Sequence, residues 1–167
     1  LGVPQPALNL GMDAHSNVEA LSFSVDNTKA SLPIVFIQNP LTKFPIPLPI
    51  PDISLLNPPL GALPPIPKSI HLLKDTAKLS PMAALSKGLA EAAGSADAVT
   101  ATGSVDVLRY GSVLKARQLV GVRGAGSAFD GLYYVKSVTS NFKPGEFKQN
   151  FTLTRNGLIS TLPRVPV

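Results

Sequence analysis

Polar and hydrophobic residues alternate along two runs near the C-terminal end of the chain, 132–139 and 146–155. The first run places on one face Tyr133, Val135, Ser137 and Thr139, and on the other Leu132, Tyr134, Lys136 and Val138. The second run places on one face Phe147, Gln149, Phe151 and Leu153. A period of two, with many β-branched and aromatic residues, is typical of half-buried strands. Pro144 and Gly145 between the runs suit positions i+1 and i+2 of a type II turn, so the sequence predicts a β-hairpin.

Two strands are predicted near the N-terminus. Residues 18–25 alternate and bring Leu21, Phe23 and Val25 to one face. Residues 32–38 form a short apolar run, typical of a strand buried on both faces, with Pro33 at an edge or among its first residues. We expect these strands to pair as a hairpin across residues 27–31.

Further strands and one helix are predicted downstream. Residues 103–108 and 119–123 are expected as short strands joined by residues 109–118, and the tail from residue 156 as irregular. The helix runs from Pro81 to about residue 93, because Ser80 is a good N-cap, Pro81 suits the first helical turn and Gly94 suits the end. Spacing indicates a buried face made of Met82, Leu85 and Leu89.

A proline-rich segment separates these regions. Proline occurs ten times between residues 40 and 67, which excludes a helix interior or a central strand. Residues 44–51 alternate proline with large apolar residues, which predicts an extended segment with Ile46, Leu48 and Ile50 turned one way. The leucine and isoleucine content indicates an ordered arm that docks on a neighbouring subunit or packs on its own domain. A PxxP ligand for an SH3-like module is the weakest alternative.

These patterns predict a mainly-β, β-barrel-like fold with hairpins, one short α-helix and a Pro-rich extended arm. We divide the chain into three segments: residues 1–39, a β-hairpin segment completing an upstream or shared β domain; residues 40–79, the arm; and residues 80–167, the helix and a C-terminal β module. Because the chain begins without Met and lacks a signal-peptide pattern, we expect it to be a C-terminal piece of a longer protein.

Composition narrows the class of protein. The absence of Cys excludes disulfides, thiolate nucleophiles and Cys-ligated metals, and no apolar run approaches the roughly 20 residues that a membrane helix needs. The first 102 residues carry six Lys/Arg and seven Asp/Glu, whereas residues 103–167 carry nine and three. The basic half is compatible with a nucleic-acid or other polyanionic partner. Its spread through the predicted strands favours instead solvent-facing charges that protect strand edges.

No candidate catalytic, cofactor or metal site meets its usual pattern, and we expect neither enzyme activity nor a cofactor. Residues 121–126, Gly-Val-Arg-Gly-Ala-Gly, match neither the dinucleotide fingerprint nor a P-loop and are expected as a tight turn between strands. His15 and His71 lack a second ligand at metal-binding spacing. Asp130 and Glu146 are the carboxylates that a hydrolase alternative would use, although the Asp-Gly pair at residue 130 is typical of a turn.

A longer stretch resembles a known family. The resemblance is carried by Gly103-Ser-Val-Asp-Val-Leu-Arg-Tyr-Gly111, Leu114-Lys-Ala-Arg117, Leu119-Val-Gly-Val-Arg-Gly124, Phe129-Asp-Gly-Leu-Tyr-Tyr-Val135, Gly145-Glu-Phe-Lys-Gln149 and Phe151-Thr-Leu-Thr-Arg155. This stretch is similar to the C-terminal part of phage late control protein D, a family of tail baseplate hub proteins related to the hub part of VgrG. The likeness covers residues 95–160 well and residues 1–70 weakly.

The resemblance implies a β-rich structural hub protein of a phage tail or phage-like contractile injection system. Such hubs form homotrimers that join a central spike to the tail tube, and the family offers no catalytic residues to carry over. We expect a virion baseplate or assembled injection particle as the location, with synthesis in the bacterial cytoplasm, and a separate spike protein and a tube or tube-initiator protein as partners. Because aromatic residues and Arg are favoured at interface hot spots, the candidate subunit interface comprises Arg109, Tyr110, Arg117, Arg123, Tyr133 and Tyr134.

Overall fold

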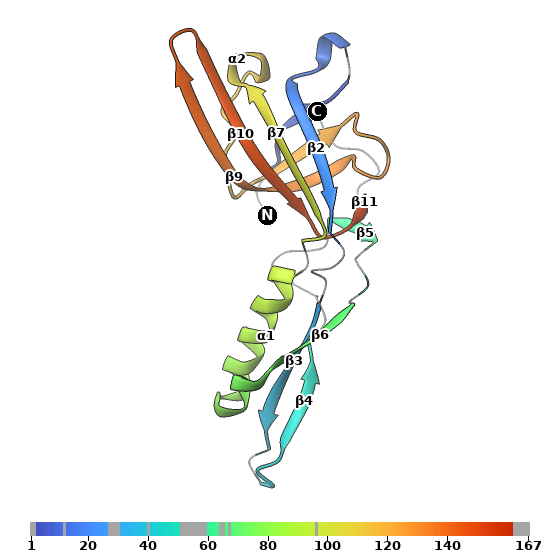
Figure 1. Ribbon diagram of the computed structural model, residues 1–167, viewed down its shortest axis with the longest axis vertical. Helices are drawn as coiled ribbons and strands as arrows, with labels where there is room; N and C mark the ends of the chain where they lie inside the picture. The colour runs from blue at the N-terminus through green and yellow to red at the C-terminus, as the bar shows by residue number, and fades with distance from the viewer. Residues whose placement is uncertain are drawn as a thin grey trace. The chain divides into compact units, whose positions relative to one another are not determined.

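The computed structural model describes residues 3–11, 13–26, 31–39, 41–50, 60–63, 66, 68–95 and 97–161 (Figure 1). The fold is mainly β, as predicted, with one α-helix longer than four residues among the described residues. The chain divides into two compact units, which are described separately and whose boundaries differ from those of the three sequence segments. Unit 1 comprises Leu1–Asp26, Pro59–Pro64 and Ala98–Val167, and unit 2 comprises Asn27–Pro58 and Pro65–Asp97.

Unit 1 is built on a six-stranded sheet that curls into a half-barrel (Figure 1). Its strand order is β1-β8-β9-β10-β7-β2. The strands are β1 (Gln5–Asn9), β8 (Leu119–Arg123), β9 (Gly131–Lys143), β10 (Glu146–Arg155), β7 (Val99–Asp106) and β2 (Val18–Val25). Two short helical turns, η1 (Asp13–His15) and α2 (Val107–Tyr110), lie between strands. The apolar inner face encloses the core, which includes Leu8, Val99, Val120, Tyr133 and Leu153.

The predicted C-terminal hairpin is confirmed as β9 and β10. Its turn is Pro144 and Gly145, and the φ of 78° at Gly145 is the positive value that position i+2 of a type II turn requires. The strict alternation predicted for β9 holds only as far as Val135. There the register shifts, with Thr152 opposite Ser137 and Leu153 opposite Val135, so that one extra residue bulges out of β9. Val138 therefore packs on the same core as Val135 instead of facing away from it.

The predicted hairpin between residues 18–25 and 32–38 is wrong. Strand β2 pairs antiparallel with β7, bringing Leu21 opposite Gly103 and Phe23 opposite Ala101. Gly103 makes this approach possible, because a Cβ there would lie 2.4 Å from the carbonyl oxygen of Ala20. Pairing between strands about 80 residues apart is possible because the entropic cost of closing a loop rises only slowly with loop length.

The tail expected to be irregular contains a further strand. Strand β11 (Leu158–Ser160) pairs with β5 (Gly61–Leu63) in a two-stranded sheet. The side-chain oxygen of Asn156 accepts hydrogen bonds from the N–H groups of Leu60 and Gly61 at 2.9 and 3.1 Å. Residues 162–167 lie outside the described residues.

Unit 2 is a three-stranded sheet in the order β4-β3-β6, with helix α1 (Pro81–Ser95) packed against it. Its strands are β3 (Ser31–Gln38), β4 (Pro45–Pro49) and β6 (Ser69–Leu73), and a 3-10 turn, η2 (Lys74–Lys78), precedes the helix. Strand β3 is central, and Pro33 is its third residue, as the sequence allowed. Burial on both faces is only partly right, because Val35 is fully buried against α1 whereas Ile34 and Phe36 are half-buried.

Within the proline-rich segment, residues 41 and 42 form a turn and residues 45–49 form an edge strand of the sheet. Ile46 lies opposite Ile37 and Leu48 opposite Val35, and the N–H of Ile50 donates to the carbonyl of Pro33 at 2.9 Å. The alternate prolines therefore turn their donor-less nitrogens away from β3, which is the arrangement that an edge strand tolerates. Residues 51–59 lie outside the described residues, so docking of the arm on another subunit stays a prediction.

The predicted helix and its N-cap are confirmed, but its predicted buried face is only partly right: Leu85 packs against the core of unit 2, and Met82 and Leu89 do not. The hydroxyl of Ser80 accepts from the N–H of Ala83, whereas Met82 and Leu89 are 74% and 46% exposed. The buried face is made of small residues, with Ala84 and Ala92 inside and Gly88 between them. A Cβ on Gly88 would lie 2.7 Å from Cγ1 of Val35, so the helix approaches the sheet more closely than a leucine face would permit.

Candidate interaction surfaces

The outer face of the unit 1 sheet is rich in hydroxyl and amide side chains. Register places Asn150 between Ser104 on β7 and Thr139 on β9, and Thr152 between Thr102 and Ser137. The hydroxyl oxygens of Ser22 on β2 and Thr102 lie 3.0 Å apart. This face is suited to hydrogen bonding with water or with a polar surface, since its side chains carry both donors and acceptors.

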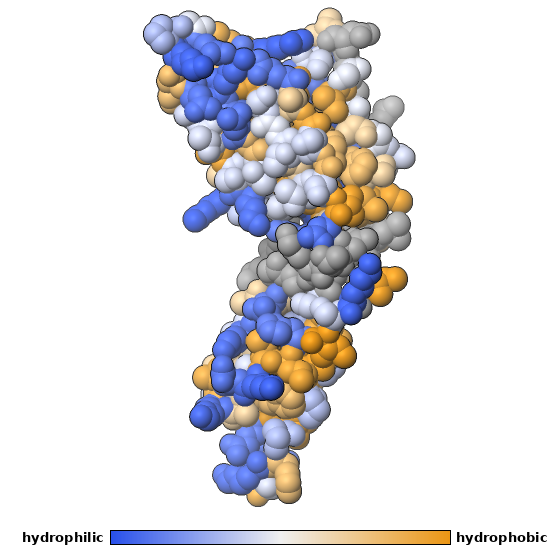
Figure 2. All heavy atoms as spheres, viewed as in Figure 1, coloured by the Kyte–Doolittle hydropathy of each residue, from blue (hydrophilic) through white to orange (hydrophobic). Residues whose placement is uncertain are grey.

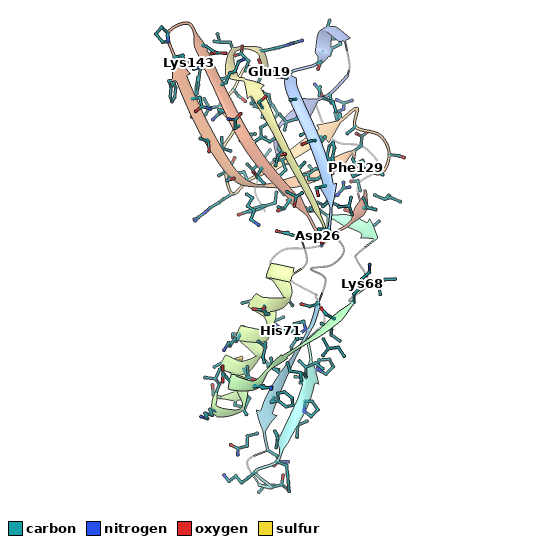
Figure 3. All side chains as sticks on the ribbon, in the orientation of Figure 1. Glu19, Asp26, Lys68, His71, Phe129 and Lys143 are labelled. Atoms are coloured by element: carbon teal, nitrogen blue, oxygen red, sulfur yellow. The ribbon has the colours of Figure 1, made fainter. Side chains whose placement is uncertain are left out.

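Charged residues are concentrated at the hairpin end of this face. The Lys148 ammonium lies 2.8 Å from Glu146 and 2.9 Å from Glu19 of β2, and Figure 3 shows Glu19 and Lys143 on neighbouring parts of this end. The hydrogen bond and charge of Lys148 hold the pKa of Glu146 below its usual value, and the two carboxylates raise the pKa of Lys148. Because these groups are solvated, they contribute little to stability.

An open cavity of about 560 Å³ lies over these charges, lined by Glu19, Ser104, Asn141, Phe142, Glu146 and Lys148 among others. Phe142 is 72% exposed and stacks on Phe147 with ring centroids 4.1 Å apart. The hairpin end therefore presents an exposed aromatic ring beside a charged surface. Such a combination is compatible with protein contact.

Two of the six candidate interface residues are used inside the chain. Tyr133 is fully buried, and its hydroxyl donates to the carbonyl of Phe129 at 2.8 Å. Burial raises the pKa of Tyr133 to about 12. Tyr110 is 7% exposed and donates to the carbonyl of Pro6 at 2.6 Å, and burial raises the pKa of this hydroxyl as well. Both side chains therefore stabilise the half-barrel.

The other four candidates lie nearer the surface. Arg109 and Arg117 are exposed, while Arg123 and Tyr134 are partly exposed. Arg109 lies in the last turn of α2, and Arg117 lies in the loop before β8 with a φ of 64°. Because only one chain is present, their role at a subunit interface stays a prediction.

Arg155 is a structurally important residue that the interface prediction did not include. It is 1% exposed, lies at the end of β10 and donates to three carbonyls, of Gly157 at 2.7 Å, Asp130 at 3.0 Å and Ala128 at 2.7 Å. Its guanidinium carbon also lies 4.5 Å from the centre of the Tyr133 ring, a cation–π contact. Burial lowers the pKa of this guanidinium, but an arginine remains charged in proteins.

Gln149 has a similar role at the other end of the core. It is 1% exposed, and its amide accepts from the N–H of Leu114 at 2.8 Å and donates to the carbonyl of Leu114 at 3.2 Å. A further hydrogen bond runs to the hydroxyl of Ser140. Gln5 pairs in the same way with the backbone of Lys115. Burial of Gln149 and Arg155 could have been predicted from the sequence, since both residues fall on the apolar face of an alternating strand.

The residues considered for catalysis are placed in structural roles. The Asp130 carboxylate accepts from the N–H of Ala125 at 2.7 Å, whereas Glu146 pairs with lysines. The glycine-rich residues after β8 form the expected turn, with positive φ at Gly124 and Gly126. His71 of β6 lies 3.4 Å from Glu91 of α1. Among the described residues, no group of three or more His, Asp or Glu is placed to hold a metal ion.

No protein-family model matches the sequence, and no curated protein matches it. Two solved structures have a similar fold. The tail protein from Neisseria meningitidis MC58 has a TM-score of 0.59 and 16% identity, with 95% of this chain and 46% of that chain covered. The 43 kDa tail protein of prophage MuSo2 from Shewanella oneidensis has a TM-score of 0.59 and 16% identity, with 90% and 44% covered. The chain therefore has the fold found in these two tail proteins and spans slightly less than half the length of each.

No helix among the described residues is long and apolar enough to cross a membrane.

Proposed function

We propose that this chain is a structural component of a phage tail or phage-like contractile injection system. The observation that carries the proposal is that 95% and 90% of the chain align with two tail proteins. The resemblance to late control protein D is a second line of support, because it is based on sequence and not on the fold. It covers strands β7 to β10 of unit 1. The proposed role is mechanical, so no catalytic residue is required.

The finer proposal is a baseplate hub: a homotrimer that joins a separate central spike to the tail tube. A threefold adaptor needs surfaces for its neighbours, and Arg109, Arg117, Arg123 and Tyr134 remain available for this at the surface of unit 1. The hairpin end, with exposed Phe142 beside Lys148 and Glu146, is a second surface of suitable chemistry.

Native mass spectrometry of the purified chain tests the hub. A trimer is expected, and it should dissociate when Arg109 and Arg117 are both replaced by Glu. The control replaces Lys87, an exposed residue of α1, by Glu and should leave the trimer intact. A monomer at every concentration up to about 100 μM would overturn assembly by this chain, because an interface of standard size binds more tightly than that.

The alternative, a polyanion-binding module, is less well supported. Of the basic residues in the C-terminal half, Arg155 is buried beneath carbonyls and Lys148 is paired with two carboxylates. Salt titration of binding to random DNA separates the two functions: a phosphate-binding surface loses affinity steeply as salt rises. Tight binding at physiological salt would favour the alternative over the hub.

A further inference from the structure

The two edges of the unit 2 sheet differ in what they offer to a partner. On β4, the residues whose backbone points away from β3 are Pro45, Pro47 and Pro49. This edge therefore has no outward N–H donor within the strand and can offer only carbonyl acceptors to another strand. On the opposite edge, β6 has the sequence Ser-Ile-His-Leu-Leu, with neither proline nor a fully charged residue.

Register identifies which backbone groups of β6 have no strand partner among the described residues. The N–H of Ile50 donates to the carbonyl of Pro33, so odd-numbered β3 residues turn their backbone toward β4 and even-numbered ones toward β6. Strand β6 runs parallel to β3 with Leu72 opposite Ile34. In a parallel pair, Ile34 then bonds to the residues on either side of Leu72. The backbone N–H and C=O groups of Ile70 and Leu72 consequently point to the outer edge.

The same residues lie on an apolar face. Val35 and Leu73 pack toward α1, so their neighbours Ile34 and Leu72 turn to the opposite side of the sheet, as do Ile70 and its partner Leu32. Ile70 is 65% exposed and Leu72 is 47% exposed. Hydrophobic residues gather around β4 and β6 in Figure 2. An open edge next to an apolar face is the combination that binds an added strand.

The charges at the ends of β6 indicate which charges a strand added to this edge would carry. Lys68 and Lys74 flank β6 and are both exposed, and Figure 3 shows Lys68 beside this strand. A second copy paired antiparallel through Ile70 and Leu72 would be centred on His71. It would set Lys68 of one copy opposite Lys74 of the other, and like charges directly opposite are destabilising. Carboxylates at those positions would instead be attracted.

We propose that the outer edge of β6 binds an extended segment of a partner protein by strand addition. The segment would carry apolar residues at alternate positions and Asp or Glu at its ends. The backbone groups of Ile70 and Leu72 would bind its main chain, the apolar face would accept its side chains, and Lys68 and Lys74 would pair with its acidic ends. This inference depends only on unit 2 and stands independently of the tail function proposed above.

The test uses the ¹⁵N-labelled full chain and two synthetic peptides, Glu-Val-Thr-Val-Thr-Val-Glu and Lys-Val-Thr-Val-Thr-Val-Lys. The acidic peptide should shift the amide signals of Ile70 and Leu72 and bind about tenfold more tightly than the basic one, because two charge pairs are gained and two like-charge repulsions are avoided. Leu72→Pro removes an outward N–H that β3 does not use, and should weaken binding at least about tenfold. Leu72→Thr, the matched control, keeps the backbone N–H and should reduce the affinity for the peptide much less.

A second variant keeps the test decisive if Leu72→Pro does not fold. Replacement of Lys68 and Lys74 by Glu should reverse the preference between the two peptides. The proposal is overturned if neither peptide shifts these two amides at about 1 mM, the weak end of specific binding. Equal binding by a folded Leu72→Pro variant would also overturn it. So would protection of the β6 amides that rises with protein concentration alone, since the occupant would then be a second copy.

Discussion

Replacing Arg155 by Met tests the importance of the buried guanidinium. Methionine retains most of the apolar stem but removes all donors to the carbonyls of Ala128, Asp130 and Gly157. Each unpaired buried carbonyl costs about 1 to 3 kcal/mol, and relief of the buried charge offsets part of that cost. We expect a net loss of about 3 kcal/mol in the free energy of unfolding, and a larger loss for Arg155→Ala, which also opens a cavity.

Urea unfolding followed by circular dichroism measures this loss. The control, Arg109→Ala, removes an exposed arginine from the same unit and should change stability by less than about 0.5 kcal/mol. Arg155→Lys should fall between the wild type and Arg155→Met, because one ammonium cannot reproduce the fixed fork of the guanidinium. A loss below about 1 kcal/mol for Arg155→Met would refute the reasoning, since the carbonyls of Asp130 and Gly157 both lose their side-chain donor, whereas the carbonyl of Ala128 still accepts from the N–H of Ile159.

Three further predictions concern packing, a buried amide and pH. Gly88→Ala should cost about 1 kcal/mol in unfolding experiments, because overpacking against Val35 outweighs the gain in helix propensity, and the cost should shrink in a Val35→Ala background. Gln149→Leu should cost about 2 to 4 kcal/mol and speed hydrogen exchange at the Leu114 amide, whereas Gln5→Leu, which breaks the equivalent exposed pair, should cost less than about 1 kcal/mol. The Tyr133 pKa is raised from 10.0 to about 12, so the unfolded chain loses this proton first and stability should fall above pH 10.0. The slope, up to about 1.4 kcal/mol per pH unit, should be reduced in urea titrations of Tyr133→Phe.

The features predicted correctly from the sequence are those set by neighbours in the chain. The hairpin follows from alternation and from Pro144 and Gly145, and the start of α1 follows from Ser80. The partner of β2 could not be derived, because its alternating face fits any strand with a complementary apolar face. The bulge in β9 was invisible for a similar reason: it exists only relative to the register of β10.

Part of the helix face was misassigned because the prediction assumed that the largest apolar side chains are the buried ones. Leu89 and Met82 are the larger side chains, yet the close approach of α1 to Val35 requires glycine and alanine. The candidate interface was also chosen by residue type, and it included two residues that are buried. Tyr110 and Tyr133 are hot-spot residue types, but each is buried with its hydroxyl bonded to a backbone carbonyl. Residue type alone does not distinguish a tyrosine that fills a core from one that meets a partner.

The stretch that carries the family resemblance has a structural explanation in β10. Its inner face is apolar in the middle, at Phe151 and Leu153, and polar at both ends. At one end Gln149 holds the loop at Leu114, and at the other Arg155 holds the backbone at residues 128, 130 and 157. The runs Gly-Glu-Phe-Lys-Gln and Phe-Thr-Leu-Thr-Arg each end on one of these residues. Gln149 and Arg155 therefore fix two irregular segments of the chain to one strand.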